Sequence, residues 1–565
     1  MKKIYARQIR FSAVVVFMMA MCVAAGFAQT YTPLYTYPET NRNNTGILPA
    51  GLISQGRDGF LYTTDGYNGA NSFGSVFKMS TSGQPTTIYS FCPQAGCKDG
   101  AYPLGGVALG FDGNLYGTTQ GGGANAAGTV FKVTPGGVLT DLHDFANGTD
   151  DSVPIFPVLQ GQDGSVYGVS VGQYVGQYGA FYKITSAGAF TAPYDFDFNH
   201  GDFPNLPTQG TDGNFYGTTI LGGQPACSGY QGGCGVVYKL TSAGKETVLW
   251  DFKGFFSNDG ALPEGFLVQG NDGNFYGATR EGGNSSRCGG GCGTVFKITP
   301  SGTLTILYNF TGAPDGAYPD TGVTVGTDGN LYGVTSVGGK FNDGALYQVT
   351  PAGTETIIYN FCSATGCVDG FNPETPLVQH TNGKFYGNTT GNSLGGGVFF
   401  SLDMGLKPFA GLVTWVGKVG RSVEILGQGL TGTTKVSFNG TGATTFKVVT
   451  DTYLTATVPE GATTGFVTVT TPGGARKSNR KFLVTPQVLS FSPDQGPVGT
   501  VVTIKGDSLT QTQGVGFGDK IPAAFTVNDD MTVTATVPTG AKTGPVLVKT
   551  PGGLATSSAT FTVTP

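Results

Sequence analysis

The fold is decided by residues 271–310, NDGNFYGATREGGNSSRCGGGCGTVFKITPSGTLTILYNF. Four strand-like runs occur in or just before this stretch, at residues 265–269, 274–279, 294–299 and 303–310. The last run alternates apolar with polar residues from Leu304 to Phe310, the pattern of a half-buried strand. Asp272 and Gly273 join the first two runs in a tight turn, because Gly supplies positive φ and Asp bonds the neighbouring backbone. The stretch therefore predicts a four-stranded antiparallel sheet.

This unit recurs along the chain. The glycine of a DG or NG pair falls at positions 59, 113, 164, 213, 273, 329 and 383. A period of about 50 to 60 residues suits a four-stranded propeller blade better than the shorter coils of most solenoids. Gly at 95 of 565 residues and only 12% charged residues also fit short strands and tight turns. The sequence predicts an all-β protein built mainly from a seven-bladed β-propeller.

The seventh unit stops before its fourth strand. After residues 398–400 the chain reaches Gly405 without a further run of the LYNF type. Residues 33–37, PLYTY, have the spacing of ILYNF at 306–310 and precede the first complete unit. An amino-terminal strand in the last blade would close the ring and leave no bare sheet edge. We therefore expect residues 31–37 to complete the seventh blade.

The repeated pattern also matches a known family. The run DGNxYGTTxxGG, followed by GTVFK and then LYxF, resembles the GloVer repeat, or choice-of-anchor tandem repeat, of exported bacterial proteins over residues 31 to about 404. This resemblance implies a propeller in an exported protein, and it assigns no activity.

A second periodicity begins near Pro408. TATVP at 455–459 recurs at 534–538, and TPGG at 471–474 recurs at 550–553, so both motifs are shifted by the same interval. The pattern VTIKG, VGFG, TATVP, GAKTG and VLVKTPGG resembles the IPT/TIG family of immunoglobulin-like domains. Such modules are usually spacers or binding appendages of surface and secreted proteins. We expect a signal peptide at 1–28, the propeller at 29–404, and two IPT/TIG-like β-sandwich domains at 405–485 and 486–565.

The amino-terminal segment, at positions 1–28, indicates export. Lys2, Lys3, Arg7 and Arg10 precede an apolar run that ends at the small residues Gly26 and Ala28, as in a cleaved signal peptide. The apolar run is shorter than the roughly 20 residues of a membrane helix. Removal of residues 1–28 leaves 27 basic and 36 acidic residues. The resulting net charge of −9 disfavours binding to nucleic acid. We expect an extracellular or cell-surface protein without a membrane span, and a monomer.

The remaining eight cysteines form four close pairs. The pairs are Cys92 with Cys97, Cys227 with Cys234, Cys288 with Cys292, and Cys362 with Cys367. In an exported protein such pairs predict local disulfides. Zinc is the alternative, but the pairs lie in different repeats and lack neighbouring histidines. Each disulfide would mainly stiffen the loop that carries it.

Strand connectivity divides the loops between two faces of the disc. The plain face carries the tight DG and SG turns between first and second and between third and fourth strands. The loop-rich face carries the Gly-rich inserts between second and third strands and the links from one blade to the next. All eight paired cysteines fall on the loop-rich face. Variable, stapled loops on a rigid ring are where we expect a ligand to bind.

The links contain a recurring element, DGAYP, DGALP or DGFNP. The position four residues before the proline is occupied by Thr45, Asp99, Asp150, His200, Asp259, Asp315 and Asp369. One hypothesis is that these side chains surround the channel mouth and bind a cation, with calcium the candidate, or a polyhydroxylated ligand. The alternative is that each Asp is a turn residue that bonds its own backbone. No other cofactor or metal site is predicted.

Other polar residues have structural interpretations. The Asp of each DG turn and the repeated Tyr four residues later are expected to hold the blades together. Only three histidines occur, at 143, 200 and 380, which makes a nucleophilic triad improbable. Glu264, Glu281 and Glu374 lie on the loop-rich side and depart from the repeat, so a carboxylate pair is the remaining route to catalysis. No catalytic residue is assigned.

Three functions stay open on this basis. The favoured one is a non-catalytic binding or scaffold protein for carbohydrate or a cell-envelope component. The second is a polysaccharide-degrading glycosidase or lyase that uses loop carboxylates. The third is a structural adhesin.

Overall fold

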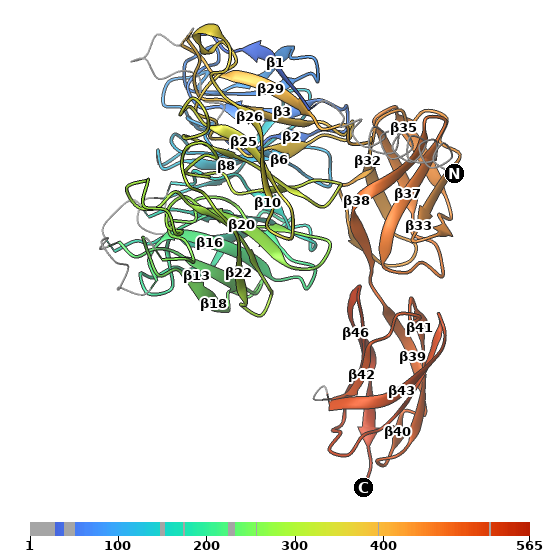
Figure 1. The fold of residues 1–565 in the computed structure, drawn as a ribbon. Coiled ribbons are helices and arrows are strands. Elements are labelled where there is room, and N and C mark those ends of the chain that lie inside the picture. Colours follow the sequence, from blue (N-terminus) through green and yellow to red (C-terminus); the bar gives the residue numbers. More distant parts are fainter. Residues whose placement is uncertain are drawn as a thin grey trace, which may run out of the picture.

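The computed structural model describes residues 29–38, 51–146, 153–172, 176–223, 232–255, 257–393, 395–518 and 521–565. Apart from the short 3-10 turn η1 (Thr365–Cys367), the regular elements of these residues are all strands, which confirms the all-β prediction. Figure 1 shows a propeller, with one small β domain against it and a second beyond the first. The predicted signal peptide lies outside the described residues. No helix in the described chain is long and apolar enough to cross a membrane.

The described chain up to residue 404 forms seven antiparallel sheets. The first three sheets are β2 (Ser54–Gln55), β3 (Leu61–Asp65), β4 (Ser75–Met79) and β5 (Pro85–Ser90); β6 (Val107–Leu109), β7 (Leu115–Thr119), β8 (Thr129–Val133) and β9 (Leu139–Asp144); and β10 (Leu159–Gln160), β11 (Val166–Ser170), β12 (Ala180–Ile184) and β13 (Phe190–Asp195). The fourth sheet contains β14 (Asp202–Pro204), β15 (Thr208–Gln209), β16 (Phe215–Leu221), β17 (Val236–Leu240) and β18 (Glu246–Asp251).

The remaining sheets repeat this order. They are β19 (Val268–Gln269), β20 (Phe275–Thr279), β21 (Thr294–Ile298) and β22 (Leu304–Asn309); β23 (Thr324–Val325), β24 (Leu331–Thr335), β25 (Ala345–Val349) and β26 (Glu355–Asn360); and β27 (Val378–Gln379), β28 (Phe385–Asn388), β29 (Val398–Asp403) and β1 (Thr30–Thr36). The inner strand β19 is shorter than the expected run 265–269, because Phe266 instead pairs with Gly322 of the next sheet.

The DG turns fold as the sequence predicts. In the first sheet Gly59 has φ 79°, and Asp58 accepts the backbone N–H of Phe60 at 3.2 Å and the Tyr62 hydroxyl at 2.7 Å. Five further Asp and Tyr pairs repeat this bond at 2.8 to 2.9 Å, at 112 and 116, 163 and 167, 212 and 216, 272 and 276, and 328 and 332. The structural interpretation of both residue types is confirmed.

The core lies between neighbouring sheets. Each of seven clusters of buried apolar residues draws on two sheets that follow one another in the ring. The last cluster joins Tyr386 and Phe399 of the final sheet to Leu61 and Phe77 of the first. Because the first and last sheets share a core in the same way as all the others, the ring is continuous.

Strand β1 completes the last sheet. It pairs antiparallel with β29 from Thr30 opposite Asp403 to Thr36 opposite Val398. The prediction that an amino-terminal strand fills the last blade is confirmed, although the strand begins and ends one residue earlier than expected. Tyr31 stacks on Tyr359 of the preceding sheet with ring centroids 3.9 Å apart.

Glutamines at the end of inner strands tie neighbouring sheets together on the plain face. The side-chain oxygen of Gln160 accepts the N–H of Phe111 at 2.6 Å, and Gln209 does the same for Gln162 at 2.8 Å. The bonds from Thr211 to Gln269 and from Thr327 to Gln379 repeat this contact. Leu109 and Val325 occupy the same position in β6 and β23, so these two junctions lack the glutamine bond.

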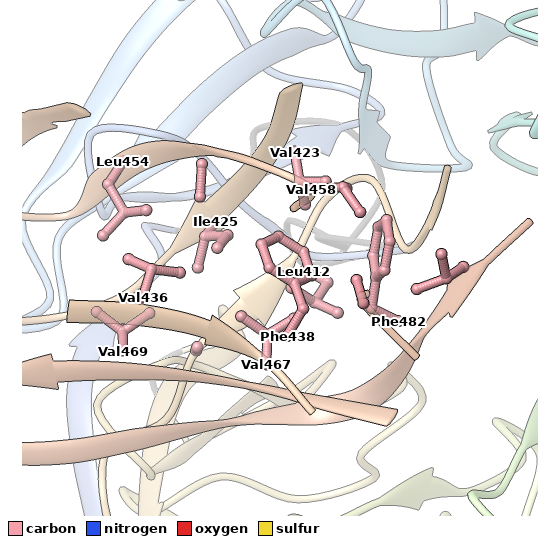
Figure 2. Close-up of a cluster of buried hydrophobic side chains, with 14 of the residues drawn as sticks. Leu412, Val423, Ile425, Val436, Phe438, Leu454, Val458, Val467, Val469 and Phe482 are labelled. Carbon is pink, nitrogen blue, oxygen red and sulfur yellow. The ribbon is translucent and has the colours of Figure 1, made fainter. Parts of the chain in front are cut away.

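The first domain behind the propeller has two facing sheets. One contains β30 (Gly411–Leu412), β32 (Ser422–Leu426), β36 (Tyr453–Thr457) and β35 (Phe446–Thr450). The other contains β31 (Val416–Gly417), β38 (Gly474–Val484), β37 (Gly465–Thr471), β33 (Lys435–Phe438) and β34 (Thr441–Gly442). Figure 2 shows the core between them, where Phe438 and Phe482 meet edge to face at 5.2 Å. We call this domain module 1.

The second domain, module 2, follows the same plan. Its strands pair in the order β39 (Gln487–Ser492), β41 (Val501–Asp507), β44 (Thr532–Thr536), β43 (Ile521–Asp529), β42 (Gly514–Phe517), β45 (Gly544–Thr550), β46 (Gly553–Val563) and β40 (Gln495–Gly496). Strand β43 pairs with both β42 and β44 and so joins the two layers. Strands β37 and β38 recur in module 2 as β45 and β46 at the interval found in the sequence, which confirms that interval.

Module 1 contacts the plain face of the propeller. Arg57, beside the first DG turn, donates to Glu424 at 2.6 Å, and its guanidinium lies 4.8 Å from the centre of the Tyr453 ring. The Asn271 side chain donates to the carbonyl of Asn479 at 3.0 Å. Arg57 and Asn271 belong to the two junctions that lack a glutamine bond. Module 1 therefore contacts both junctions that lack the glutamine bond. At the first of them Arg57 itself joins the two sheets, by donating to the carbonyls of Phe111 and Asp112.

Candidate ligand-binding face

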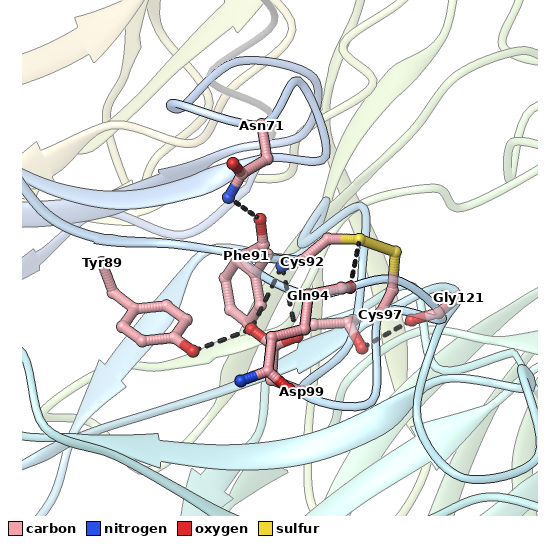
Figure 3. Close-up of a disulfide and its surroundings, with 9 residues drawn as sticks. Asn71, Tyr89, Phe91, Cys92, Gln94, Cys97, Asp99 and Gly121 are labelled. Carbon is pink, nitrogen blue, oxygen red and sulfur yellow. Dashed lines mark hydrogen bonds between the residues drawn. A yellow bond between two sulfur atoms is a disulfide. The ribbon is translucent and has the colours of Figure 1, made fainter.

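Four of the predicted link carboxylates are bound by their own link and by the outer strand before it. Asp99 accepts the Tyr89 hydroxyl at 2.7 Å and the N–H of Cys92 at 3.1 Å, as Figure 3 shows. Asp259, Asp315 and Asp369 accept the side chains of Trp250, Tyr308 and Tyr359 in the same way, at 3.1, 2.6 and 2.6 Å. These carboxylates lie beside the fourth, outermost strand of each sheet and make the bonds of turn residues.

His200, the one other predicted link residue that the structure describes, does not repeat this arrangement. His200 lies within 2.8 Å of the Asp197 carboxylate, and this hydrogen bond raises the pKa of the imidazole. Asp150 lies outside the described residues, as does Thr45. Each of the five described link residues is thus bound within its own link or by the strand before it.

Three cysteine pairs form the predicted disulfides. They are Cys92 with Cys97, Cys288 with Cys292, and Cys362 with Cys367. Cys234 is also disulfide-bonded, whereas Cys227 lies outside the described residues. Since these sulfurs are bonded to each other, the zinc alternative does not apply to the three described pairs. The disulfides fix the links and one insert on the loop-rich face.

In the six links whose proline the structure describes, the residue before that proline has a left-handed backbone. Tyr102, Phe203, Leu262, Tyr318 and Asn372 have φ of 52° to 61°, and Val153 has φ 79°. A non-Gly residue rarely adopts this conformation, which costs about 1 kcal/mol or more, and such residues cluster at active sites and ligand-binding sites. In this protein hydrogen bonds to the N–H and to the carbonyl of the residue hold the left-handed conformation.

Tyr318 shows how the backbone is held. Its N–H donates to the carbonyl of Cys292 in the insert of the preceding sheet, and its own carbonyl accepts the N–H of Ser336, both at 3.0 Å. Tyr102 and Leu262 make the same pair of bonds. Each of these side chains is only partly buried. The fold thus holds large side chains at the surface of the loop-rich face in a fixed direction.

Aromatic rings gather around two of these positions. Tyr102 lies 5.6 Å from both Tyr67 and Phe73, measured between ring centroids. Tyr178 lies 6.2 Å from Phe198 on the insert and link that flank Phe203. Tyr67 is 37% exposed, so aromatic surface remains open to solvent.

The residue after the link proline is acidic in three successive links. These residues are Glu264, Asp320 and Glu374. Arg280 donates to both oxygens of Glu264 at 3.1 and 3.2 Å, and its Nε lies 3.8 Å from Asp320. The Arg280 guanidinium also lies 5.5 Å from the centre of the Tyr318 ring. Thus two carboxylates, one cation and one aromatic ring meet at the loop-rich end of the ring.

Burial makes this group chemically unusual. Burial raises the pKa of Asp320 to about 7, against the opposing effect of Arg280. Burial also raises the pKa of Glu264, again opposed by Arg280. Asp320 therefore exchanges a proton near neutral pH, while Glu374 is exposed and accepts the side-chain amide of Asn372 at 2.7 Å.

Part of this group is predicted from the sequence. Glu264 and Glu374 are candidates there because they depart from the repeat, whereas Asp320 and Arg280 are not predicted. The signal is present one position beyond the proline, where an alignment of the links shows three consecutive acids. Glu281, the third candidate, also has a pKa raised by burial, and it contributes to the electrostatic environment of Arg280.

Comparison with protein families gives two matches. The model of the Gloeobacter/Verrucomicrobia repeat matches residues 24–158, 155–400 and 226–446. The IPT/TIG domain model matches residues 486–563, while IPT/TIG membership of residues 405–485 stays a prediction. No curated protein matches the sequence.

Several solved structures are distantly similar. The extracellular domain of a hybrid two-component system from B. thetaiotaomicron has a TM-score of 0.40 at 10% identity, covering 92% of this chain and 58% of that one. A fungal alcohol oxidase of the AA5 family, in complex with copper, has a TM-score of 0.35 at 12% identity, covering 95% and 100%. A surface glycan-binding protein from Prevotella bryantii has a TM-score of 0.21 at 18% identity, covering 26% and 38%. At these values the likenesses imply nothing about function.

Proposed function

The chain belongs to the Gloeobacter/Verrucomicrobia repeat family and carries an IPT/TIG domain, and from this premise we propose that it is an exported, non-catalytic carbohydrate-binding protein whose ligand lies on the loop-rich face. The repeat, the IPT/TIG domain and the disulfides fit a surface or extracellular binding protein. The carbohydrate ligand and the face that binds it are the proposed part.

One observation carries the proposal. The loop-rich face holds partly exposed aromatic side chains in a strained left-handed conformation, and Arg280 joins one of them, Tyr318, to the carboxylates of Glu264 and Asp320. Sugar rings pack their C–H faces on aromatic rings, and their hydroxyl groups donate hydrogen bonds to carboxylates. Tyr102, Tyr318, Glu264 and Asp320 supply both kinds of contact on a rigid scaffold.

A polysaccharide array read together with a reducing-end assay tests the proposal. The expected result is binding to at least one polysaccharide with no new reducing ends. Binding of a polysaccharide should weaken about tenfold or more when Tyr102 is replaced by Ala, because the stacking surface is lost. Val138 is 65% exposed beside β9, and V138A serves as the matched control that leaves binding unchanged. An array without any binding, or equal binding by Y102A and wild type, would exclude a sugar site at this position.

The second candidate function is polysaccharide cleavage. Asp320, with a pKa of about 7, could donate a proton near neutrality, and Glu264 on the neighbouring link would be the second carboxylate. New reducing ends or unsaturated products from wild type, lost in D320N, would favour this function over simple binding.

Cation binding by the link residues Asp99, Asp150, His200, Asp259, Asp315 and Asp369, with calcium the candidate, stays a separate prediction. Isothermal titration of the metal-free protein with calcium tests it, with Asp369→Asn as the variant. Since burial and bonds to Tyr359 already engage Asp369, an absence of heat on titration would leave these residues with their turn role alone.

A further inference from the structure

The propeller has a central channel that module 1 closes at one end. A cavity of about 350 Å³ is lined by residues in or next to the inner strands of all seven sheets, among them Leu52, Ala108 and Thr324, and by Trp415 and Arg480 of module 1. A second cavity of about 360 Å³ lies between the plain face and module 1 and shares Trp415 and Arg480 with the first. These two residues therefore form the floor of the channel.

Arg480 is an uncompensated charge in this space. It is the sole charged side chain among the described residues that line either cavity. Its guanidinium lies 4.8 Å from the centre of the Trp415 ring and has no hydrogen-bond or ion-pair partner among the described residues. Desolvation lowers the pKa of this guanidinium. Arg480 is partly buried, and a partly desolvated cation without a partner carries a free-energy cost that a bound anion would offset.

The backbone at Arg480 departs from regular strand pairing. The pairing of β37 with β38 shifts register between Phe466 and Thr468, which leaves residues 478–480 in a bulge. The Ser478 hydroxyl donates to the Arg480 carbonyl at 2.6 Å and fixes this bulge. Bulges commonly re-aim side chains next to functional sites.

Module 2 has the same bulge without the same side chains. The Ser557 hydroxyl donates to the carbonyl of Ala559 at 2.6 Å, and Ala559 is the counterpart of Arg480 at the interval that relates the two modules. At the same interval Asp494 stands where module 1 has Trp415. The fold of the module thus requires neither Trp nor Arg at these positions, and the pair occurs in the module that faces the channel.

We propose that Arg480 and Trp415 form a binding site for the carboxylate of a small organic acid at the module 1 end of the channel. The guanidinium fork would bind the two carboxylate oxygens, and Trp415 with the aliphatic inner-strand side chains Leu159 and Val268 would cover the body of the acid. The cavity between the plain face and module 1 also reaches Arg480, and neither Glu264 nor Asp320 lines it. This site is separate from the loop-rich face and does not rest on the carbohydrate proposal.

Isothermal titration of the chain from residue 29 to 565 tests this site with three probes. D-galacturonate represents an acidic sugar, hexanoate represents an aliphatic acid, and D-galactose is the neutral counterpart of the first. Binding of either acid without binding of D-galactose is the expected result, and the acid that binds more tightly tells which kind of body the channel accepts. If neither acid binds, or if D-galactose binds as tightly as D-galacturonate, the proposal is wrong.

Two variants on the same strand separate the role of Arg480 from a general loss of charge. Arg480→Gln should weaken acid binding about tenfold or more, since charge-assisted hydrogen bonds are lost. Arg476→Gln removes a charge four residues earlier on β38, outside both cavities, and should leave the affinity unchanged. Equal affinities of R480Q and wild type, or equal losses in both variants, would overturn the proposal. If R480Q does not fold, a crystal structure of the wild type with the bound acid decides, and an acid located away from Arg480 contradicts the site.

Discussion

Gln55 and Thr381, far apart in the chain, hold the first and last sheets of the propeller together by two hydrogen bonds. The Gln55 side-chain amide donates to the Thr381 hydroxyl at 2.8 Å, and the N–H of Thr381 donates to the Gln55 oxygen at 2.9 Å. This is the glutamine contact of the other junctions, placed where the chain must close on itself. Both residues are buried, so water cannot replace either bond.

Gln55→Leu should destabilise the whole propeller. Leu109 stands at the same position of the next inner strand, so the fold accepts Leu there, and the loss comes from the unpaired N–H of Thr381. We expect the free energy of unfolding in urea to fall by about 1–3 kcal/mol. Gln379→Leu is the control, because the bond from Thr327 to Gln379 is exposed to water and its loss should cost less. Equal losses of unfolding free energy in the two variants would show that the contact that closes the ring adds no more stability than any other glutamine contact.

Tyr37→Ala tests how much the amino-terminal segment contributes to the stability of the last sheet. Tyr37 is 5% exposed, donates its hydroxyl to Asn388 at 3.0 Å and belongs to the cluster shared with Phe77. Removal of a large buried aromatic side chain costs about 3–5 kcal/mol, which a thermal melt should register as a large drop in Tm. Thr36→Ala, exposed at the end of β1, should change little.

Truncations extend the same test. Deletion of residues 29–38 should lower the stability of the propeller far more than deletion of residues 486–565. If the amino-terminal deletion leaves the stability unchanged, the pairing of β1 with β29 does not stabilise the propeller.

Asp320→Asn should stabilise the protein above neutral pH. The pKa of Asp320 is raised to about 7 in the folded state, so this carboxyl favours folding below its ordinary pKa of 3.8 and loses that contribution as pH rises to about 7. The neutral amide does not titrate. We expect D320N to melt at a higher temperature than wild type at pH 8, with a difference that shrinks towards pH 4. A constant difference at every pH would mean that Asp320 ionises normally.

Arg57→Ala should release module 1 from the propeller. Arg57 binds Glu424 and the carbonyls of Phe111 and Asp112, and Thr452 donates to the Arg57 carbonyl. Without this side chain, small-angle scattering should report a larger radius of gyration, and urea should unfold module 1 separately from the ring. Lys435→Ala, an exposed substitution on β33, should do neither. An unchanged scattering curve for R57A would mean that contacts other than those of Arg57 hold module 1 on the propeller.

The repeat makes the propeller predictable because its contacts are local. Asp58 and Tyr62 are four residues apart, and their bond lies within one hairpin, so each repeat carries the signal for its own folding. The amino-terminal strand is also predictable, since it completes a unit that is visibly short of one strand. The glutamine contacts are not predicted, because each bond joins two different repeats. Gln does recur four residues before the DG or NG glycine in five of the seven units, but this spacing does not name its partner.

The candidate sites are less predictable, for a physical reason. Arg280 and Asp320 come from different sheets and meet only because the ring places their loops together. Trp415 and Arg480 owe their position to the docking of module 1 on the channel, which no periodicity in the sequence encodes. A side chain whose role depends on how whole domains meet leaves no trace in the spacing of its neighbours.

The pairing of β1 with β29 has a consequence for how the protein comes into being. Thr30 is synthesised early and its partner Asp403 much later, so β1 is among the last of the described propeller strands to pair. Until then, its edge and the edge of the unfinished ring are exposed, and contacts between residues so distant in the chain form slowly. During that interval β1 of a second nascent chain could pair with β29 of the first. The order of synthesis, rather than the finished structure, therefore sets how long the protein must be protected from pairing with another copy of itself.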